Sequence, residues 1–337
     1  MSYTIAEILE RLGSRGDLDA AAAAAGFATL MDGNLTPAQA GAFLMGLRAK
    51  GETALEIAAA VKAVLERAKL VTGLPSPRFD PVGTGGDKSC SFNCSTAVAL
   101  AMAGMGYKVV KHGNRAISSQ CGSADVVEAL GLPMPNEPKA VEAELEKRGF
   151  VFLFAPSFHP SFKHIMPVRR ELGIRTLFNL LGPLVNPARP THQLVGVARA
   201  EILDLVAETL LLTGVTRAAV VHGQGGLDEL TPFGPAQVVW VGNGSTVRTV
   251  LDPAELGIAS CDPADITVRD KTQALAVLRE LLGGAGPKGM REMLVLNLAV
   301  AIHLLEDAPG LLECVERARA GLASGAALKL VDSIASG

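Results

Sequence analysis

Residues 80–131 contain four polar segments: DPVGTGGD at 80–87, SFNCST at 91–96, KHGNR at 111–115 and GSAD at 122–125. A short strand pattern overlaps the start of the first segment and another precedes the third, and apolar helical patterns follow the second and fourth. We therefore predict strands at 79–82 and 107–110 and helices at 95–105 and 123–130. Strands that alternate with helices in this way indicate a parallel α/β sheet.

The same alternation continues to about residue 221, with strands expected at 150–154, 193–197 and 217–221 and a helix at 201–213. The first seventy residues instead show helical patterns only, with capping boxes that begin at Thr36 and Thr53. The fold class is thus α/β, with a small all-helical N-terminal domain and a larger α/β domain around a mainly parallel sheet. We expect the helical domain at 1–72, completed by about 160–187, and the α/β domain at 75–159 and 188–337.

The composition of the 337 residues narrows the function classes. Apolar residues make up 49%, the formal net charge is -3, and the chain has one Trp and two Tyr. A nucleic-acid partner is disfavoured, because such proteins usually present a basic face and stacking aromatics. The N-terminus lacks a signal-peptide pattern, and the apolar run 293–305 is too short to span a membrane, so no membrane partner is expected. Five scattered cysteines indicate reduced thiols and a cytoplasmic location.

The glycine-rich loop at 83–86 follows a predicted strand, and Asn93, Ser95 and Thr96 open the next predicted helix. Glycines let successive backbone N–H groups turn toward one anion, and a helix N-terminus also favours phosphate. An ordinary glycine turn followed by a polar helix cap is the alternative. Neither the P-loop nor the dinucleotide fingerprint is present. Three polar side chains at one helix start favour a phosphate site.

The segment 111–115 places two cations, an imidazole and an amide at the end of another strand. Ligands of open α/β sheets bind outside the carboxyl ends of the strands. A solvated charged loop is the alternative reading. Ser118, Ser119 and Ser123 follow at once, before a helix, which favours a second phosphate cradle, and Asp125 is expected to be a first-turn charge of that helix.

Three later features complete the candidate site. Arg169 can grip a carboxylate with two hydrogen bonds, and His159 precedes it. Asp228 and Glu229 follow a strand and a glycine turn, where adjacent carboxylates can hold Mg²⁺ through water. A solvated acidic turn is the alternative for this pair, and a structural role is the alternative for His159.

Taken in order, these segments resemble the anthranilate phosphoribosyltransferases over nearly the whole chain. The resemblance also rests on MDGNLT at 31–36, VRRELG at 168–173, RTLFN at 175–179, LGPL at 181–184 and GLDE at 226–229. It implies transfer of the phosphoribosyl group of 5-phosphoribosyl diphosphate to the amine of anthranilate, with Mg²⁺ as cofactor and release of pyrophosphate. It also implies a phosphorylase-like fold and a homodimer formed through the helical domain.

The resemblance assigns a large set of residues to the phosphoribosyl diphosphate site. These are Gly83, Gly86, Asp87, Ser91, Asn93, Cys94, Ser95, Thr96, Lys111, His112, Gly113, Asn114, Arg115, Ala116, Ile117, Ser118, Ser119 and Ser123.

The resemblance also implies the remaining roles. Ser95, Asp228 and Glu229 would bind Mg²⁺. Anthranilate would contact four residues, namely Gly83, Asn114, His159 and Arg169. The catalytic residues would be Lys111, His112, Asn114 and Arg169.

Two enzymatic alternatives stay open at this point. One is a pyrimidine nucleoside phosphorylase, which resembles this family in architecture and also has a glycine-rich phosphate loop. The other is a paralogue that uses a different aromatic amine. A nucleic-acid-binding relative with the same fold is the non-enzymatic alternative, which the mildly acidic composition disfavours.

Overall fold

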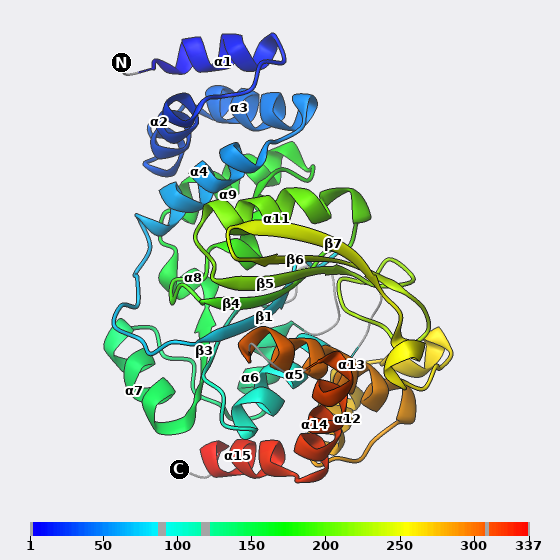
Figure 1. Cartoon of the computed structure of the whole chain (residues 1–337). Coiled ribbons are helices and arrows are strands. Elements are labelled where there is room, and N and C mark those ends of the chain that lie inside the picture. The colour runs from blue at the N-terminus through cyan, green and yellow to red at the C-terminus, as the bar shows by residue number, and fades with distance from the viewer. Residues whose placement is uncertain (1–2, 87–91, 116–121, 307–309, 336–337) are drawn as a thin grey trace.

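The computed structural model describes residues 3–86, 92–115, 122–306 and 310–335. Helices α1 to α4 form one end of the molecule, and the C-terminal helices form the opposite end, with the sheet between them (Figure 1). The predicted α/β class with an N-terminal helical region is therefore confirmed.

Within the described residues, the sheet has seven strands in the order β3-β2-β1-β4-β5-β6-β7. The strands β3, β2, β1, β4 and β5 run parallel, and β6 and β7 add an antiparallel edge. Their bounds are Phe79–Gly83 (β1), Val109–Gly113 (β2), Phe150–Phe154 (β3), His192–Gly196 (β4), Arg217–His222 (β5), Ala236–Gly242 (β6) and Ser245–Leu251 (β7).

The mainly parallel sheet that the sequence predicted is confirmed, with two local differences. The strand expected at 107–110 is β2, which begins at Val109 and continues through Lys111 and His112. The polar pair therefore belongs to the strand, so its direction is fixed by the sheet. The edge pair β6–β7 was not predicted. Most side chains of β7 are exposed and give no continuous apolar run, whereas the apolar VVWV run of β6 was overlooked.

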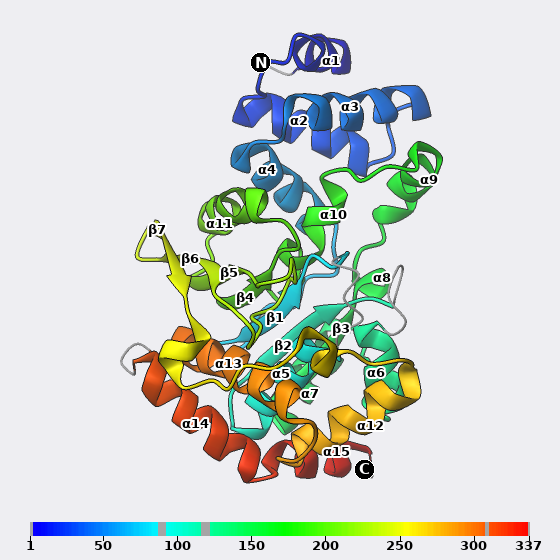
Figure 2. The same ribbon diagram turned by 90° about the vertical axis from the view of Figure 1, so that its right-hand side faces the viewer.

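The N-terminal helices begin where the sequence placed their caps. Thr36 caps α3 and Thr53 caps α4, each with a reciprocal capping box. The helices of this end are α1 (Ile5–Gly13), α2 (Ala20–Met31), α3 (Pro37–Lys50), α4 (Ala54–Leu65), α9 (Phe162–Leu172) and α10 (Phe178–Leu181). The later pair packs on the earlier helices, with α9 against α2 and α3 and α10 against α4 (Figure 2). The exact division of the chain into domains remains a prediction.

The remaining helices surround the sheet or lie at the C-terminal end of the molecule. They are α5 (Cys94–Gly104), α6 (Ser123–Ala129), α7 (Pro138–Arg148), α8 (Ala155–Phe158), α11 (Leu203–Leu212), α12 (Lys271–Leu282), α13 (Lys288–Leu305), α14 (Leu311–Ala323) and α15 (Ala326–Ala335).

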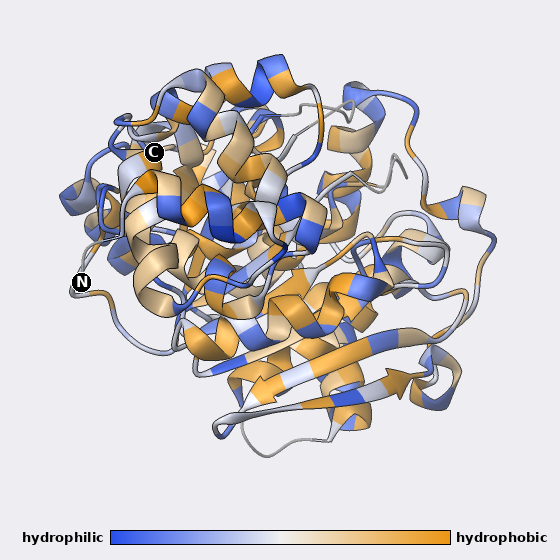
Figure 3. Ribbon diagram, turned by 90° about the horizontal axis from the view of Figure 1, so that it is seen from above, coloured by the Kyte–Doolittle hydropathy of each residue, from blue (hydrophilic) through white to orange (hydrophobic). Residues whose placement is uncertain are grey.

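Each face of the sheet belongs to a different hydrophobic core. Leu194 and Ala219 point toward α5 and α13, whereas their neighbours Val195 and Val220 join a core that includes α11 and the N-terminal helices. This alternation is the period-two pattern of strands. Many of the surrounding helices mix hydrophilic and hydrophobic residues along their ribbons, as amphipathic helices do (Figure 3). The sheet is thus supported from both sides, and its strand ends are held firmly enough to position a site.

None of the helices that the structure describes combines the length and hydropathy needed to cross a bilayer.

Candidate active site

The glycine loop after β1 packs directly against the Asp228–Glu229 turn. The Gly85 N–H donates to Asp228 Oδ2 at 2.6 Å, and Gly85 and Gly86 have positive φ values of 68° and 83°. A Cβ atom at Gly83 would overlap the Asp228 carboxylate. Glycine is therefore required here both for the turn and for close approach of the acidic pair.

The start of α5 meets the end of β2 at the same place. Lys111 Nζ donates to Ser95 Oγ at 3.2 Å and to the Pro81 carbonyl at 2.7 Å, and the Ser95 N–H donates to Glu229 Oε1 at 3.0 Å. The predicted Lys111, Ser95 and Glu229 are therefore brought together from segments far apart in the sequence. Lys111 is 1% exposed, and this burial lowers its pKa.

The acidic turn fits a magnesium ion by its donor chemistry. Asp228 and Glu229 offer carboxylate oxygens, Glu229 contacts Ser95 through the Ser95 backbone N–H, and the Ser95 hydroxyl adds a third hard oxygen donor. Among the described residues, no group of three or more His, Cys, Asp or Glu side chains is arranged to hold a metal. Mg²⁺ suits such a sparse set, because it commonly keeps several waters and takes further ligands from phosphate.

Two buried histidines lie beside this cluster. His112 Nε2 is 3.3 Å from His159 Nε2, and His112 Nδ1 is 3.2 Å from the Gly182 carbonyl. Because a carbonyl can only accept, Nδ1 of His112 carries the proton and its Nε2 is left as an acceptor. Burial lowers the pKa of His112 to about 3 and that of His159 to about 4, so both rings are neutral near pH 7.

The residues that follow β2, Asn114 and Arg115, contact α6. The Asn114 carbonyl accepts from Ser123 Oγ at 3.4 Å, which joins the strand end to the start of α6. Arg115 instead forms ion pairs with Asp125 and Glu128 at 3.0 and 2.8 Å. Its predicted phosphate contact would therefore compete with these exposed pairs.

Arg169 lies in the last turn of α9, a helix of the helical end. Its guanidinium carbon is 5.5 Å from the Phe178 ring centroid, and its Nη1 is 3.8 Å from Met166 Sδ. Burial lowers its pKa. Neither contact satisfies the planar set of N–H donors, which therefore suits a carboxylate ligand.

The other predicted residues divide into two groups. The described ones lie at the same strand and helix ends, with Asn93 at the cap of α5, Cys94 and Thr96 buried in its first turn, and Gly113 at the end of β2. Outside the described residues lie Asp87, Ser91, Ala116, Ile117, Ser118 and Ser119.

Sequence reasoning gave no role to Arg175, which touches the glycine loop. Arg175 Nη2 donates to the Gly86 carbonyl at 3.2 Å, and the Arg175 carbonyl accepts from Arg48 of α3. Hydrogen bonds thus connect α3 to the glycine loop through Arg175. The one indication of Arg175 in the sequence is its place in the RTLFN segment at 175–179, which contributes to the family resemblance.

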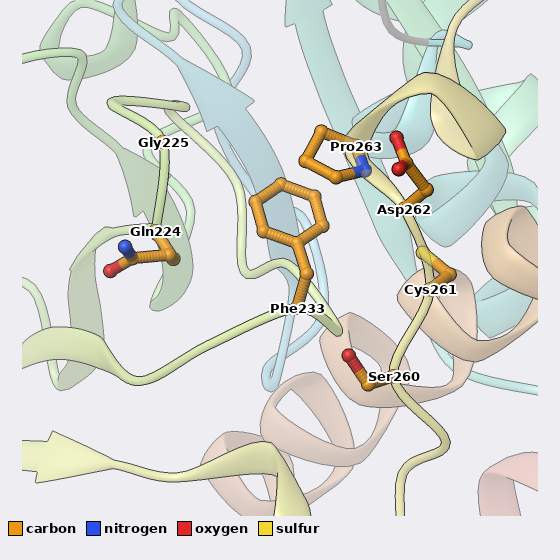
Figure 4. Close-up of a pocket in the computed structure, with 7 residues that line it drawn as sticks. All are labelled: Gln224, Gly225, Phe233, Ser260, Cys261, Asp262 and Pro263. Atoms are coloured by element: carbon orange, nitrogen blue, oxygen red, sulfur yellow. The ribbon is translucent and has the colours of Figure 1, made fainter.

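A separate cavity of about 570 Å³ opens beside the segment that leads into the acidic turn (Figure 4). Phe233 projects between Gln224 and Pro263, and Cys261 and Asp262 lie on the opposite wall. None of the predicted site residues lines this cavity, so the candidate site is defined by the strand ends and not by it.

Two family models match the chain and agree with its architecture. The model described as "Glycosyl transferase family, helical bundle domain" covers residues 6–68, and "Glycosyl transferase family, a/b domain" covers 76–328. Fold and matched models together define a class, the two-domain glycosyl transferases.

Relatives refine this class. The chain is 59% identical over 329 residues to an anthranilate phosphoribosyltransferase of Nitratidesulfovibrio vulgaris, covering 96% of this chain and 97% of the relative. It is 56% identical over 328 residues to that of Oleidesulfovibrio alaskensis, covering 97% and 99%. The chain belongs to the anthranilate phosphoribosyltransferase family.

Solved structures agree. The crystal structure of the Thermus thermophilus enzyme matches with a TM-score of 0.91 and 38% identity, covering 98% of each chain. An anthranilate phosphoribosyltransferase from Saccharomyces cerevisiae, in complex with PRPP and Mg, matches with a TM-score of 0.86 and 29% identity, covering 99% of this chain and 98% of that chain.

Proposed function

We propose that this protein transfers the phosphoribosyl group of 5-phosphoribosyl diphosphate to the amine of anthranilate, releasing pyrophosphate. The observation that carries the proposal is the meeting of Lys111, Ser95 and the Asp228–Glu229 turn at the ends of β1 and β2. A similar yeast enzyme binds PRPP and Mg, and another structure of it holds 4-fluoroanthranilate.

The donor side stabilises the leaving group. As the bond between C1 and the diphosphate breaks, positive charge develops on the sugar and negative charge on the diphosphate. Lys111 faces this negative charge from a buried position, where an ammonium acts more strongly than in water. When bound, Mg²⁺ neutralises diphosphate oxygens, and Asp228, Glu229 and Ser95 would hold it. The Gly85 and Ser95 N–H groups already donate to Asp228 and Glu229, so the Gly86 N–H and the positive end of α5 would attract the remaining phosphate oxygens.

The acceptor side orients the amine. Arg169 holds the anthranilate carboxylate with two hydrogen bonds, which directs the neighbouring amine nitrogen toward C1. The nitrogen lone pair forms the new bond to C1, the diphosphate leaves with the old bonding pair, and the amine loses a proton to water. An arylamine is neutral near pH 7, so no strong base is required. The rings of His112 and His159 are neutral as well, and they would line the anthranilate site.

The test is a fluorescence assay on the purified protein. Anthranilate emission should fall when 5-phosphoribosyl diphosphate and Mg²⁺ are added together, and pyrophosphate should appear in equal amount. Thymidine and uridine with inorganic phosphate should give no cleavage. Cleavage of these nucleosides, with anthranilate untouched, would replace the proposal by a phosphorylase.

We further propose that the protein is a cytoplasmic homodimer joined through its helical end. The exposed apolar side chains of Met45 on α3 and Leu55 on α4 support a contact at this end. The described cysteines Cys94, Cys261 and Cys314 are free thiols, which is in keeping with a reducing compartment. Light scattering after size-exclusion chromatography should give twice the chain mass, and a single-chain mass would refute the dimer.

A further inference from the structure

Asp80 is a fully buried carboxylate in β1 that the mechanism above does not use. Its side chain is 0% exposed. Its Oδ1 accepts from the His112 backbone N–H at 3.3 Å, and its Oδ2 accepts from Asn186 Nδ2 at 2.8 Å. A buried carboxylate is costly unless its oxygens are hydrogen-bonded. The two hydrogen bonds explain why the fold tolerates Asp80, but they do not explain why a carboxylate stands at this position.

Asn186 extends this contact to two further segments. Its Nδ2 also donates to the Val110 carbonyl at 2.7 Å, and its Oδ1 accepts from the Ala188 N–H at 2.9 Å. Asn186 is 2% exposed, and it follows the short turn that contains Gly182. The pair Asp80–Asn186 therefore ties β1 and β2 to the segment 182–188, whose Gly182 carbonyl also contacts the His112 ring.

These hydrogen bonds bracket Lys111 on both sides. Val110 is held by Asn186, and His112 is held by Asp80, so the backbone of the residue between them has little freedom. Lys111 Nζ in turn reaches the carbonyl of Pro81, the neighbour of Asp80. The nearby charges that favour the Lys111 ammonium are led by Asp80, ahead of Glu229.

We propose that Asp80 and Asn186 form a positioning pair that holds Lys111 and His112 in place for the transfer reaction. The proposal rests on the function proposed above. Neither residue touches substrate in it; both act through β2. The pair joins positions 106 residues apart. It links β1, which leads into the glycine loop, to the segment 182–188, which contacts His112.

Two variants test the pair by different means. Asp80→Asn removes the charge and one acceptor, since the amide group that replaces an oxygen faces either Asn186 Nδ2 or the His112 N–H. Asn186→Ser leaves every charge unchanged but removes the Nδ2 group that donates to both Asp80 and Val110, and the shorter serine hydroxyl can donate to one acceptor at most. The control for loss of a buried carboxylate elsewhere is Glu292→Gln, because Glu292 on α13 is also buried and accepts from the Ala259 N–H, in addition to its ion pair with Arg319.

We expect both test variants to lower kcat by about 10- to 100-fold, because small displacements of catalytic groups cost this much. The KM for anthranilate should stay at the wild-type value, since Arg169 is untouched. Glu292→Gln should keep the wild-type kcat. Each protein is first checked for cooperative unfolding, and calorimetry with 5-phosphoribosyl diphosphate and Mg²⁺ is run on the wild type.

Each outcome decides the proposal. A wild-type kcat in folded Asp80→Asn or Asn186→Ser would overturn it, and so would an equal loss in Glu292→Gln. If one test variant fails to fold, the other decides; if neither folds, the pair is a stability element and the positioning role is refuted. A wild-type protein that neither binds the donor nor turns over would instead refute the proposed function, which separates the two failures.

Discussion

Lys111 at the end of β2 is almost fully buried, whereas Arg169 on α9 is only partly covered. The Lys111 ammonium already has two hydrogen-bond acceptors, Pro81 and Ser95. The Arg169 guanidinium has a ring face and a sulfur, and no ion pair with any residue that the structure describes. The Lys111 ammonium is thus already hydrogen-bonded to oxygen acceptors, whereas the Arg169 guanidinium contacts only an aromatic ring and a sulfur among the described residues.

Under the proposed function, this difference predicts how each substrate is bound. Lys111 is linked to Glu229 through Ser95, and Asp228 is held by Gly85, so these groups are positioned by internal hydrogen bonds. The proposed partner of Arg169 is the carboxylate of anthranilate. We therefore expect donor-side variants to damage turnover and acceptor-side variants to damage binding.

The largest effect is expected for Lys111→Ala. Removing a preorganised charge that faces the leaving group should lower kcat by about 100- to 1,000-fold. Steady-state fluorescence kinetics measures this, with Lys108→Ala as the control because Lys108 donates only to carbonyls of α7. A kcat near that of the control would remove Lys111 from the leaving-group site.

Asp228→Asn tests the metal side of the donor site. The amide keeps the shape of the carboxylate but loses its charge, so the Mg²⁺ concentration that gives half-maximal rate should rise by about tenfold or more. A Mg²⁺ titration at saturating substrates provides the measurement. An unchanged magnesium profile would exclude Asp228 from the metal site.

Arg169→Ala should affect the acceptor alone. Loss of a charge-assisted hydrogen bond costs about 1.5–3 kcal/mol, which corresponds to an increase of about 10- to 100-fold in the KM for anthranilate. The KM for 5-phosphoribosyl diphosphate should not change. Arg170→Ala, on the next residue of α9, is the matched control, and equal effects on both substrates would break the comparison between the two sides.

The smallest effect concerns the pH dependence of stability. Burial holds the pKa of His159 at about 4, below its ordinary value of about 6.5. Between these values the unfolded chain takes up a proton that the folded chain does not, so His159 makes the protein less stable as the pH falls. His159→Gln should reduce the slope of unfolding free energy against pH by about 1.4 kcal/mol per unit in this range.

Urea denaturation at several pH values measures that slope. An identical slope in wild type and variant would show that folding does not lower the pKa of His159. Asp80 works in the opposite direction, because burial raises its pKa to about 6 and the folded chain takes up its proton first. Asp80 is present in both the wild type and His159→Gln, so its contribution cancels when the two slopes are compared.

The sequence was sufficient for the parallel strands and for the gathering of polar groups at their ends. Short apolar runs marked β3, β4 and β5, and the strand-end rule placed the 111–115 segment at a ligand site. That Ser95 and Asp228 share one site was implied by the family resemblance. The edge strand β7 was missed, because an exposed strand carries little apolar signal.

Pairings between distant residues could not be predicted in the same way. Asp80 lies in a short strand and Asn186 in a turn, and nothing in either local pattern indicates that they meet. The contact of Arg175 with Gly86 likewise depends on how the helical end packs on the sheet. Such contacts follow from tertiary packing, which single-sequence patterns do not encode.

The preformed donor side is tested most directly by isothermal titration of 5-phosphoribosyl diphosphate into the wild-type protein in Mg²⁺ buffer without anthranilate. We predict saturable heat with one donor molecule per chain. Absence of heat from correctly folded protein would contradict a donor site built at the ends of β1 and β2.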